Sequence, residues 1–284
     1  MKKTPASAVT LTDFDVSVGD RTLRCVLSEP AQLAEQPAVL LHHDPAPEHL
    51  SGESPSYGLT CKAFLASGHR VVGYELPNHG SRIGDWPRQE IGGMCDAFVA
   101  GSDPFAMVVQ DGRAMVDTII ERGWAPANHI FIAGCSRGGY CALRMMAGDS
   151  RIRAGQMDAP VTDWRALTEF ADFRDREDVA GLALKHYVAD LVGRPIWTGI
   201  GNCDNRVSTA CYWEFCLAMG GEQEKRGMTE SRFVSQVVEA PGHGFPVQAR
   251  EQGAAWLVKL ANEPVLEVGD KSRNRTDQPE GVHE

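Results

Sequence analysis

The sequence predicts an α/β protein built on a mostly parallel sheet. Short apolar, β-rich segments alternate with longer segments in which apolar residues recur every three or four positions, as in strands joined by helices. The first two β-rich segments differ, because they flank Gly19-Asp20 and therefore predict an antiparallel hairpin. Functional loops of parallel sheets lie at the carboxyl ends of the strands, so the segments after each strand are where functional residues are expected.

The N-terminal half predicts the hairpin, two short strands and two helices. Pro37 precedes a short apolar run, and Gly68 and Gly123 each follow a segment of helical spacing, where a glycine is a common stop signal. The expected strands are 8–18, 21–27, 38–42 and 70–74, and the expected helices are 57–66 and 104–122. A turn-rich loop, 76–82, follows the fourth strand.

The C-terminal half continues the alternation and adds one insertion. The expected strands are 130–133, 154–157, 195–200 and 233–239, and the expected helices are 140–147, 207–219 and 247–260. Segment 162–194 is more polar and carries helical stripes, so we expect a small helical insertion there. Residues 8–261 form the predicted single domain, with helices on both faces of the sheet, and residues 262–284 form a polar, flexible tail.

Composition excludes several classes of function. The chain has 284 residues, 43% of them apolar, and carries 28 basic against 38 acidic side chains, a net charge of −10. Nucleic acid is bound through clustered Lys and Arg, so we expect no nucleic-acid partner. No apolar run approaches the roughly 20 residues that span a bilayer, and no secretory signal is visible. Eight cysteines without a C-x-x-C pair favour reduced thiols in a cytoplasmic protein. The oligomeric state stays open.

The motif Gly134-Cys135-Ser136-Arg137-Gly138 carries the clearest chemical signal. It directly follows an apolar strand and precedes a predicted helix, which is the context of a nucleophile elbow. Glycines around the serine allow the tight turn, and the first N–H groups of the helix favour an oxyanion nearby. The alternative is a glycine-rich turn with an incidental serine.

A nucleophilic serine needs a base and a carboxylate that orients the base. Asp204 follows the predicted strand 195–200, and His243 follows the predicted strand 233–239, between two glycines. Because parallel strand ends share one edge of the sheet, these side chains are expected near Ser136. Asp163 is the competing carboxylate. Asp204 could instead cap the following helix, and His243 could be a plain turn residue.

Together these segments resemble the α/β-hydrolase superfamily, and Gly138-Gly139 is similar to its dienelactone hydrolase and prolyl-oligopeptidase-like branch. The loop Leu76-Pro-Asn-His-Gly-Ser81 also resembles the P-G-H-G-x-S loop of that superfamily. The resemblance implies an eight-stranded sheet, a nucleophile after strand five and an oxyanion hole of two backbone N–H groups. It also implies that segment 162–194 is a small helical insertion over the active site. One donor is then Arg137. The other is His43 or Asp44, since Pro45 has no N–H and the usual His-Gly is absent.

The expected function is a serine carboxylic-ester hydrolase that acts on a small-molecule ester without a cofactor. A peptidase, a thioester hydrolase or a C–C bond hydrolase would use the same residues, and a non-catalytic ligand-binding protein is the alternative from another class. Four aromatic residues are candidates for the substrate pocket, although such stripes commonly serve packing. They are Trp86, Phe98, Trp164 and Tyr187. Metal binding by His42-His43 lacks a partner at ligand spacing.

Overall fold

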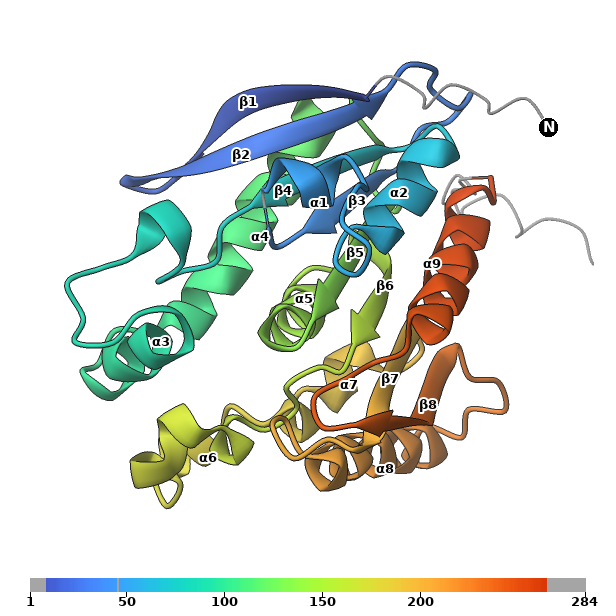
Figure 1. Ribbon diagram of the computed structural model, residues 1–284. Coiled ribbons are helices and arrows are strands. Elements are labelled where there is room, and N and C mark those ends of the chain that lie inside the picture. The colour runs from blue at the N-terminus through green and yellow to red at the C-terminus, as the bar shows by residue number, and fades with distance from the viewer. Residues whose placement is uncertain (1–8, 45, 265–284) are drawn as a thin grey trace, which may run out of the picture.

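A computed structural model describes residues 9–44 and 46–264 of the chain, so Ala8, Pro45 and most of the predicted tail lie outside the described residues. Its centre is one eight-stranded sheet in the order β1-β2-β4-β3-β5-β6-β7-β8 (Figure 1). The sheet follows the α/β-hydrolase pattern predicted from the sequence, with Ser136 directly after β5 (Ile130–Cys135).

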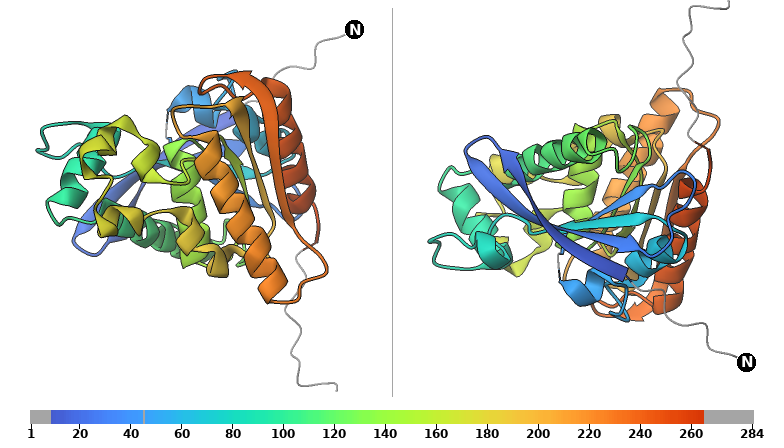
Figure 2. Two further views of the ribbon diagram at one scale, coloured as in Figure 1. Left: turned by 90° about the horizontal axis from the view of Figure 1, so that it is seen from below. Right: turned by 90° about the horizontal axis from the view of Figure 1, so that it is seen from above.

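The N-terminal hairpin forms one edge of the sheet. Strands β1 (Val9–Val18) and β2 (Arg21–Pro30) pair antiparallel along their whole length, and the turn between them contains Gly19 at a φ of 62°. Positive φ costs glycine nothing, which is why the chain reverses there. Strand β2 then pairs antiparallel with β4 (Arg70–Tyr74), which joins the hairpin to the parallel part of the sheet (Figure 2).

The remaining strands are parallel, and all of them except the edge strand β8 are largely buried, as expected for near-continuous apolar runs. They bring three chain segments from distant parts of the sequence to one edge of the sheet, namely the loops after β5, β7 and β8. The parallel strands besides β4 and β5 are β3 (Val39–His42), β6 (Ile152–Asp158), β7 (Ile196–Cys203) and β8 (Phe233–Pro241).

Two helical layers cover the sheet because alternate strand residues point to opposite faces. Leu40 packs into the cluster formed with α2 (Leu59–Ala66) and α9 (Val247–Ala261). Its neighbour Leu41 packs into the larger cluster on the other face. The helices of that second layer are α4 (Pro104–Glu121), α5 (Arg137–Gly148) and α8 (Thr209–Lys225). The prediction of helices on both faces is confirmed.

Two parts of the chain differ from the predicted elements. A helix α3 (Glu90–Val99) lies where the sequence analysis predicted no helix or strand, and its Gly92-Gly93 pair explains why helix propensity did not indicate it. The insertion 162–194 holds short turns instead of longer helices, and α3 lies beside it (Figure 2). These turns are η2 (Trp164–Ala166), η3 (Thr168–Phe173), α6 (Glu177–Ala180), η4 (Leu184–His186) and α7 (Val188–Leu191). Two further short turns are α1 (Pro47–Leu50) and η1 (Gly80–Arg82).

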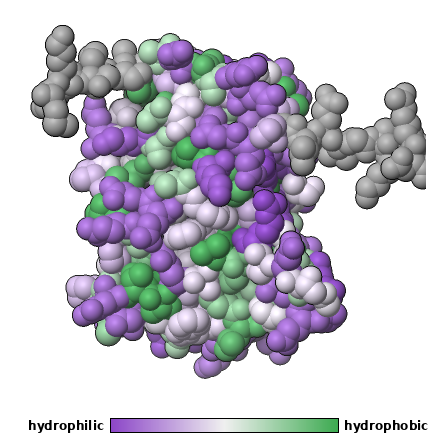
Figure 3. Space-filling view, turned by 90° about the vertical axis from the view of Figure 1, so that its right-hand side faces the viewer, coloured by the Kyte–Doolittle hydropathy of each residue, from purple (hydrophilic) through white to green (hydrophobic). Residues whose placement is uncertain are grey.

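The surface that includes α9 is mixed in character. Hydrophilic residues cover most of this face, and hydrophobic residues lie between them in small groups (Figure 3). Within residues 9–44 and 46–264, no helix combines the length and the apolar character that a membrane-spanning segment requires.

Candidate active site

Ser136 lies at a sharp turn between β5 and α5. Its backbone has a φ of 53° and a ψ of −119°, a conformation that non-glycine residues rarely adopt. Such strain costs about 1–3 kcal/mol and persists where neighbouring contacts enforce it. Here the Ser136 N–H donates to the Asp158 carbonyl at 2.9 Å, and its carbonyl accepts from Val161 N–H at 3.0 Å. The turn is therefore held by the end of β6.

Two glycines of the motif are required by close backbone contact. A Cβ on Gly134 would stand 2.3 Å from the Gly138 carbonyl oxygen, and a Cβ on Gly139 would stand 2.9 Å from the Pro160 side chain. Gly138 differs, since a Cβ there would meet the His43 ring at an ordinary 3.8 Å. The first and last of these positions thus let the helix begin immediately behind the serine.

The loops after β7 and β8 bring two further side chains to Ser136. His243 Nε2 lies 3.0 Å from Ser136 Oγ, and His243 Nδ1 lies 2.7 Å from Asp204 Oδ2. The imidazole therefore stands between the hydroxyl and the carboxylate, so the structure brings these three side chains together. With Nδ1–H donating to the carboxylate, Nε2 is left to accept the serine proton.

Asp204 is held as an anion. Its side chain is fully buried, and its other oxygen, Oδ1, accepts from the backbone N–H groups of Arg206 and Val207, both at 3.0 Å. Burial raises the pKa of Asp204, but the hydrogen bonds from His243 and from Val207 N–H outweigh burial, so the pKa lies below its ordinary value. The contact with His243 is present, whereas the cap of the following helix comes from another residue, because Ser208 Oγ accepts from Cys211 N–H at the start of α8. The competing Asp163 instead binds Arg165, at 2.6 Å.

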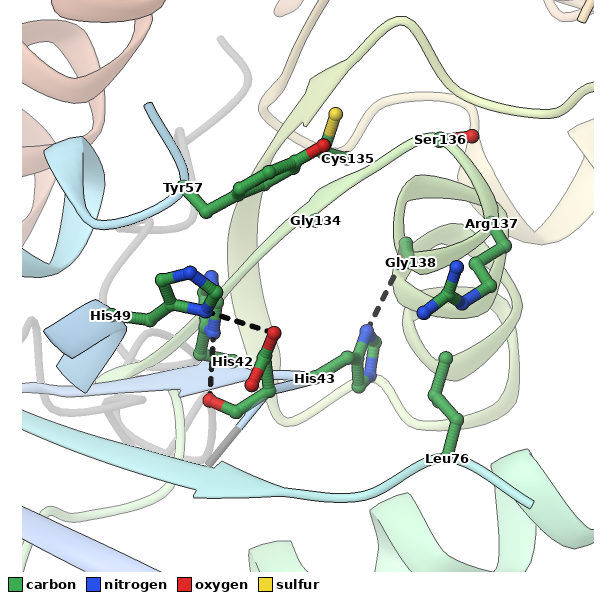
Figure 4. Close-up of a pocket in the computed structure, with 11 residues that line it drawn as sticks. His42, His43, His49, Tyr57, Leu76, Gly134, Cys135, Ser136, Arg137 and Gly138 are labelled. Carbon is green, nitrogen blue, oxygen red and sulfur yellow. Dashed lines mark hydrogen bonds and ion pairs between the residues drawn. The ribbon is translucent and has the colours of Figure 1, made fainter. Parts of the chain in front are cut away.

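A cavity of about 240 Å³ opens beside Ser136 (Figure 4). It lies between the serine turn and the loop after β3, so the predicted oxyanion segments face one space. Figure 4 shows Tyr57 on one side near Cys135 and Leu76 on the opposite side. The lining residues are His42, His43, Asp44, His49, Tyr57, Leu76 and the turn residues 134–138.

None of the four predicted pocket aromatics is among the residues that line this cavity. Trp164 is fully buried against Phe105 and Tyr140, and Phe98 packs on Phe105. The remaining two also have partners elsewhere. The Arg144 guanidinium stacks 3.7 Å from the Tyr187 ring centroid, and Trp86 packs on Gly84 in its own loop. These side chains therefore pack within the core and the insertion, and the spacing of the aromatic residues in the sequence reflects this packing.

The loop after β3 supplies lining residues that the sequence analysis missed. The Asp44 carboxylate accepts from Ala46 N–H at 2.9 Å and lies 2.8 Å from His49 Nδ1, while His42 Nδ1–H donates to the Asp44 carbonyl at 3.2 Å. Tyr57 lies 5.5 Å from His49, ring centre to ring centre. Their position after a parallel strand is the signal that could have identified His49 and Tyr57.

Burial keeps His42 and His43 neutral. It lowers the pKa of His42 below the ordinary value and that of His43 to about 3. The two rings bind different protein groups, His42 the Asp44 carbonyl and His43 the Gly138 carbonyl. Within the described residues, no three His, Cys, Asp or Glu side chains are grouped so that they could hold a metal ion.

Comparisons with known proteins agree with this fold. The prolyl oligopeptidase family matches residues 106–182, from α4 through the serine turn into the insertion. No curated protein sequence matches the chain. Three similar solved structures are between 14% and 20% identical to this chain in sequence, so they provide evidence about its fold alone. The chain has the α/β-hydrolase fold, which confirms the resemblance seen in the sequence.

Three solved structures illustrate the range of neighbours. A cold-adapted esterase from an Arctic intertidal metagenomic library is 20% identical, with a TM-score of 0.62 over 92% of this chain and 95% of its own. An acetyl xylan esterase from Paenibacillus sp. R4 is 14% identical, with a TM-score of 0.63 over 92% and 86%. Pyrococcus horikoshii acylaminoacyl peptidase is 14% identical, with a TM-score of 0.63 over 88% of this chain. The chain spans 41% of the length of that peptidase and 35% of the length of another similar structure, a putative dipeptidyl aminopeptidase IV from Bacteroides ovatus.

Proposed function

We propose that this protein is a serine hydrolase that cleaves carboxylic esters. The observation that carries the proposal is the continuous contact from Ser136 Oγ to His243 Nε2 and from His243 Nδ1 to Asp204 Oδ2, at 3.0 and 2.7 Å. Serine at a strained turn, with an imidazole nitrogen within reach of its proton, is the arrangement that nucleophilic catalysis requires.

In the proposed reaction, Ser136 Oγ attacks the ester carbonyl carbon while His243 Nε2 takes the hydroxyl proton. The buried Asp204 holds the tautomer of the imidazole and stabilises the imidazolium. His243 then gives the proton to the leaving alkoxide, which departs as the alcohol and leaves an acyl-enzyme. Water, deprotonated by the same imidazole, hydrolyses that acyl group and restores Ser136.

The negative charge that develops on the carbonyl oxygen needs donors fixed in advance. Arg137 N–H stands at the first position of α5, where it is not used by the helix itself. The N–H of His43 or Asp44 is the second donor that we propose, because their loop lines the same cavity as the serine turn. One such donor is commonly worth about 3 kcal/mol of transition-state stabilisation.

Ester cleavage is supported by the esterases among the solved structures that share this fold. The match to the prolyl oligopeptidase family keeps amide hydrolysis as the second candidate. The rates of hydrolysis of p-nitrophenyl acetate and of an aminoacyl p-nitroanilide distinguish the two candidate activities, since an esterase should hydrolyse the anilide far more slowly.

The direct test is turnover of p-nitrophenyl acetate by Ser136→Ala. We expect activity below a hundredth of wild type with an unchanged melting temperature, since the hydroxyl is not part of the core. Ser17→Ala, at an exposed position of β1, is the matched control and should keep full activity. Residual turnover above a hundredth in the Ser136 variant would place the nucleophile elsewhere.

The proposed reaction uses only groups of the protein and water, so exhaustive dialysis against EDTA should leave kcat/KM unchanged. A zinc-dependent hydrolase would lose activity on metal removal. Loss of turnover that added Zn²⁺ restores would contradict the serine mechanism and would direct attention to His42 and His43.

A further inference from the structure

The side chain of His43 contacts both segments that border the cavity at Ser136. Its Nδ1 lies 3.1 Å from the Gly138 carbonyl oxygen in the first turn of α5, and its Nε2 lies 3.1 Å from Tyr74 Oη at the end of β4. The ring also meets the Tyr74 ring edge to face, at 5.4 Å between centroids. Both ring nitrogens are therefore occupied by protein groups.

The partners determine where the ring proton lies. A carbonyl oxygen can only accept, so Nδ1 carries the hydrogen and donates it to Gly138. In the neutral ring Nε2 is then an acceptor, and the Tyr74 hydroxyl supplies the proton. Met145 Sδ, 3.2 Å from Nε2 and 2.9 Å from Tyr74 Oη, is at most a weak acceptor.

Burial makes this arrangement permanent at working pH. Burial, with smaller contributions from nearby His42 and Arg137, lowers the pKa of His43 to about 3. Burial also raises the pKa of Tyr74 well above its ordinary value, so the hydroxyl keeps the proton that it donates. The bridge therefore does not titrate in the neutral range.

The position of the bridge gives it a mechanical consequence. His43 directly follows β3 and leads into the loop closed by Asp44, while Gly138 stands two residues after Ser136. The same Gly138 carbonyl packs against Gly134 on its other side. One imidazole thus fixes the separation between the loop after β3 and the first turn of α5.

We propose that His43 is a positioning residue, whose side chain sets the distance between the two backbone segments that bind the oxyanion. This inference rests on the proposed ester hydrolysis. Oxyanion donors act only when they lie about 2.7–3.1 Å from the oxygen in the transition state. A displacement near 1 Å can cost about a hundredfold in rate. Losing the bridge should therefore lower kcat and leave substrate binding nearly unchanged.

The test compares three variants on p-nitrophenyl acetate. His43→Phe keeps a ring in the cavity wall but removes both hydrogen bonds, and we expect kcat to fall by about ten- to a hundredfold with KM within about threefold. Tyr74→Phe removes one hydrogen bond and keeps the ring contact, so its loss should be smaller and in the same direction. The Tyr74 variant also tests the proposal if the His43 variant folds poorly.

His69→Phe is the matched control. His69 is a buried imidazole at the opposite end of β3, where its Nδ1 accepts from Ala38 N–H, so its loss should lower the melting temperature and leave kcat within about twofold. A second readout is the affinity of a trifluoromethyl ketone, which forms a hemiketal oxyanion with the serine. Its affinity should fall in parallel with kcat/KM in the His43 variant, while the pH at half-maximal rate stays unchanged.

Failure of this inference is distinguishable from failure of the proposed function. If wild type neither hydrolyses the ester nor reacts with a fluorophosphonate, the proposed function is wrong. If wild type is active and His43→Phe keeps kcat within twofold, His43 has no positioning role. An equal loss of kcat in His69→Phe would likewise overturn the inference, since general loosening of β3 would then explain both variants.

Discussion

Gly134 and Gly138, the first and last residues of the motif around Ser136, have different neighbours. We therefore predict opposite outcomes when each is replaced by alanine. Gly134→Ala would place a methyl group 2.3 Å from the Gly138 carbonyl, and backbone cannot yield there without moving the serine turn by about 1 Å. We expect kcat/KM to fall by about a hundredfold. Gly138→Ala meets His43 at 3.8 Å and should stay within a few-fold of wild type. Ester turnover of both variants, with melting temperatures, checks this prediction.

The carboxylates near the site can be separated in the same way. Asp204→Asn leaves a neutral amide beside His243 and favours the wrong imidazole tautomer, which costs about 10⁴ in kcat in serine proteases. Asp163→Asn should have little effect on kcat, because Asp163 is paired with Arg165. A large loss of kcat in Asp163→Asn together with a small loss in Asp204→Asn would show that Asp163, and not Asp204, is the carboxylate that supports the imidazole.

At the scale of elements, the insertion is tied to the loop that holds Asp204. The Arg206 guanidinium contacts both oxygens of Glu169 on η3, at 2.6 and 2.7 Å, and the Arg206 backbone N–H donates to Asp204. Arg88, which precedes α3, donates to the Glu169 carbonyl at 2.9 Å. The insertion therefore stands between the α3 region and the loop after β7.

Breaking this tie should affect catalysis modestly. Both side chains are about a quarter to a third exposed, and such pairs are worth up to about 1 kcal/mol. Glu169→Gln should therefore lower kcat/KM by about fivefold at most, less so at high salt. Asp178→Asn breaks an exposed pair within the same insertion and should change nothing. Equal effects of the two variants at low salt would show that the Glu169 contact does not support the Asp204 loop.

At the scale of the whole molecule, one buried carboxyl predicts how stability depends on pH. Burial raises the pKa of Asp158 to about 6, against opposing effects of Arg250 and of the Gln156 hydrogen bond. A folded carboxyl with a raised pKa destabilises the protein once it ionises, so its contribution becomes more favourable as the pH falls from above 6 toward 4.

Asp158→Asn should remove this dependence. The free energy of unfolding of the variant relative to wild type should be higher at pH 8 than at pH 4.5 by about 2 kcal/mol, since one pKa unit corresponds to about 1.4 kcal/mol and part of the effect is already present at pH 4.5. Urea unfolding of both proteins at the two pH values measures this difference. A difference that does not change with pH would contradict the raised pKa.

The overall fold was predictable because local patterns and the sheet agree. Apolar strands, glycine stops and the motif around Ser136 each indicated the same architecture, and the loops carrying Asp204 and His243 followed from strand order. The pocket was not predictable in this way. From the sequence, Trp164 and Phe98 are candidates for the substrate pocket. In the folded chain both pack on Phe105, a contact between distant segments that the sequence pattern does not indicate. His49, Tyr57 and the bridge from His43 to Gly138 likewise depend on segments far apart in the sequence.

The central claim is that Ser136 is the nucleophile of a hydrolase, and mapping of a covalent adduct tests it most directly. A fluorophosphonate should react with the native protein in a ratio of one adduct per chain, with loss of fluoride and of ester turnover in parallel. Peptide mass spectrometry should locate the phosphonyl group on Ser136, and Ser136→Ala should remain unlabelled. An adduct on another residue, or a folded wild-type protein that forms no adduct, would contradict this account.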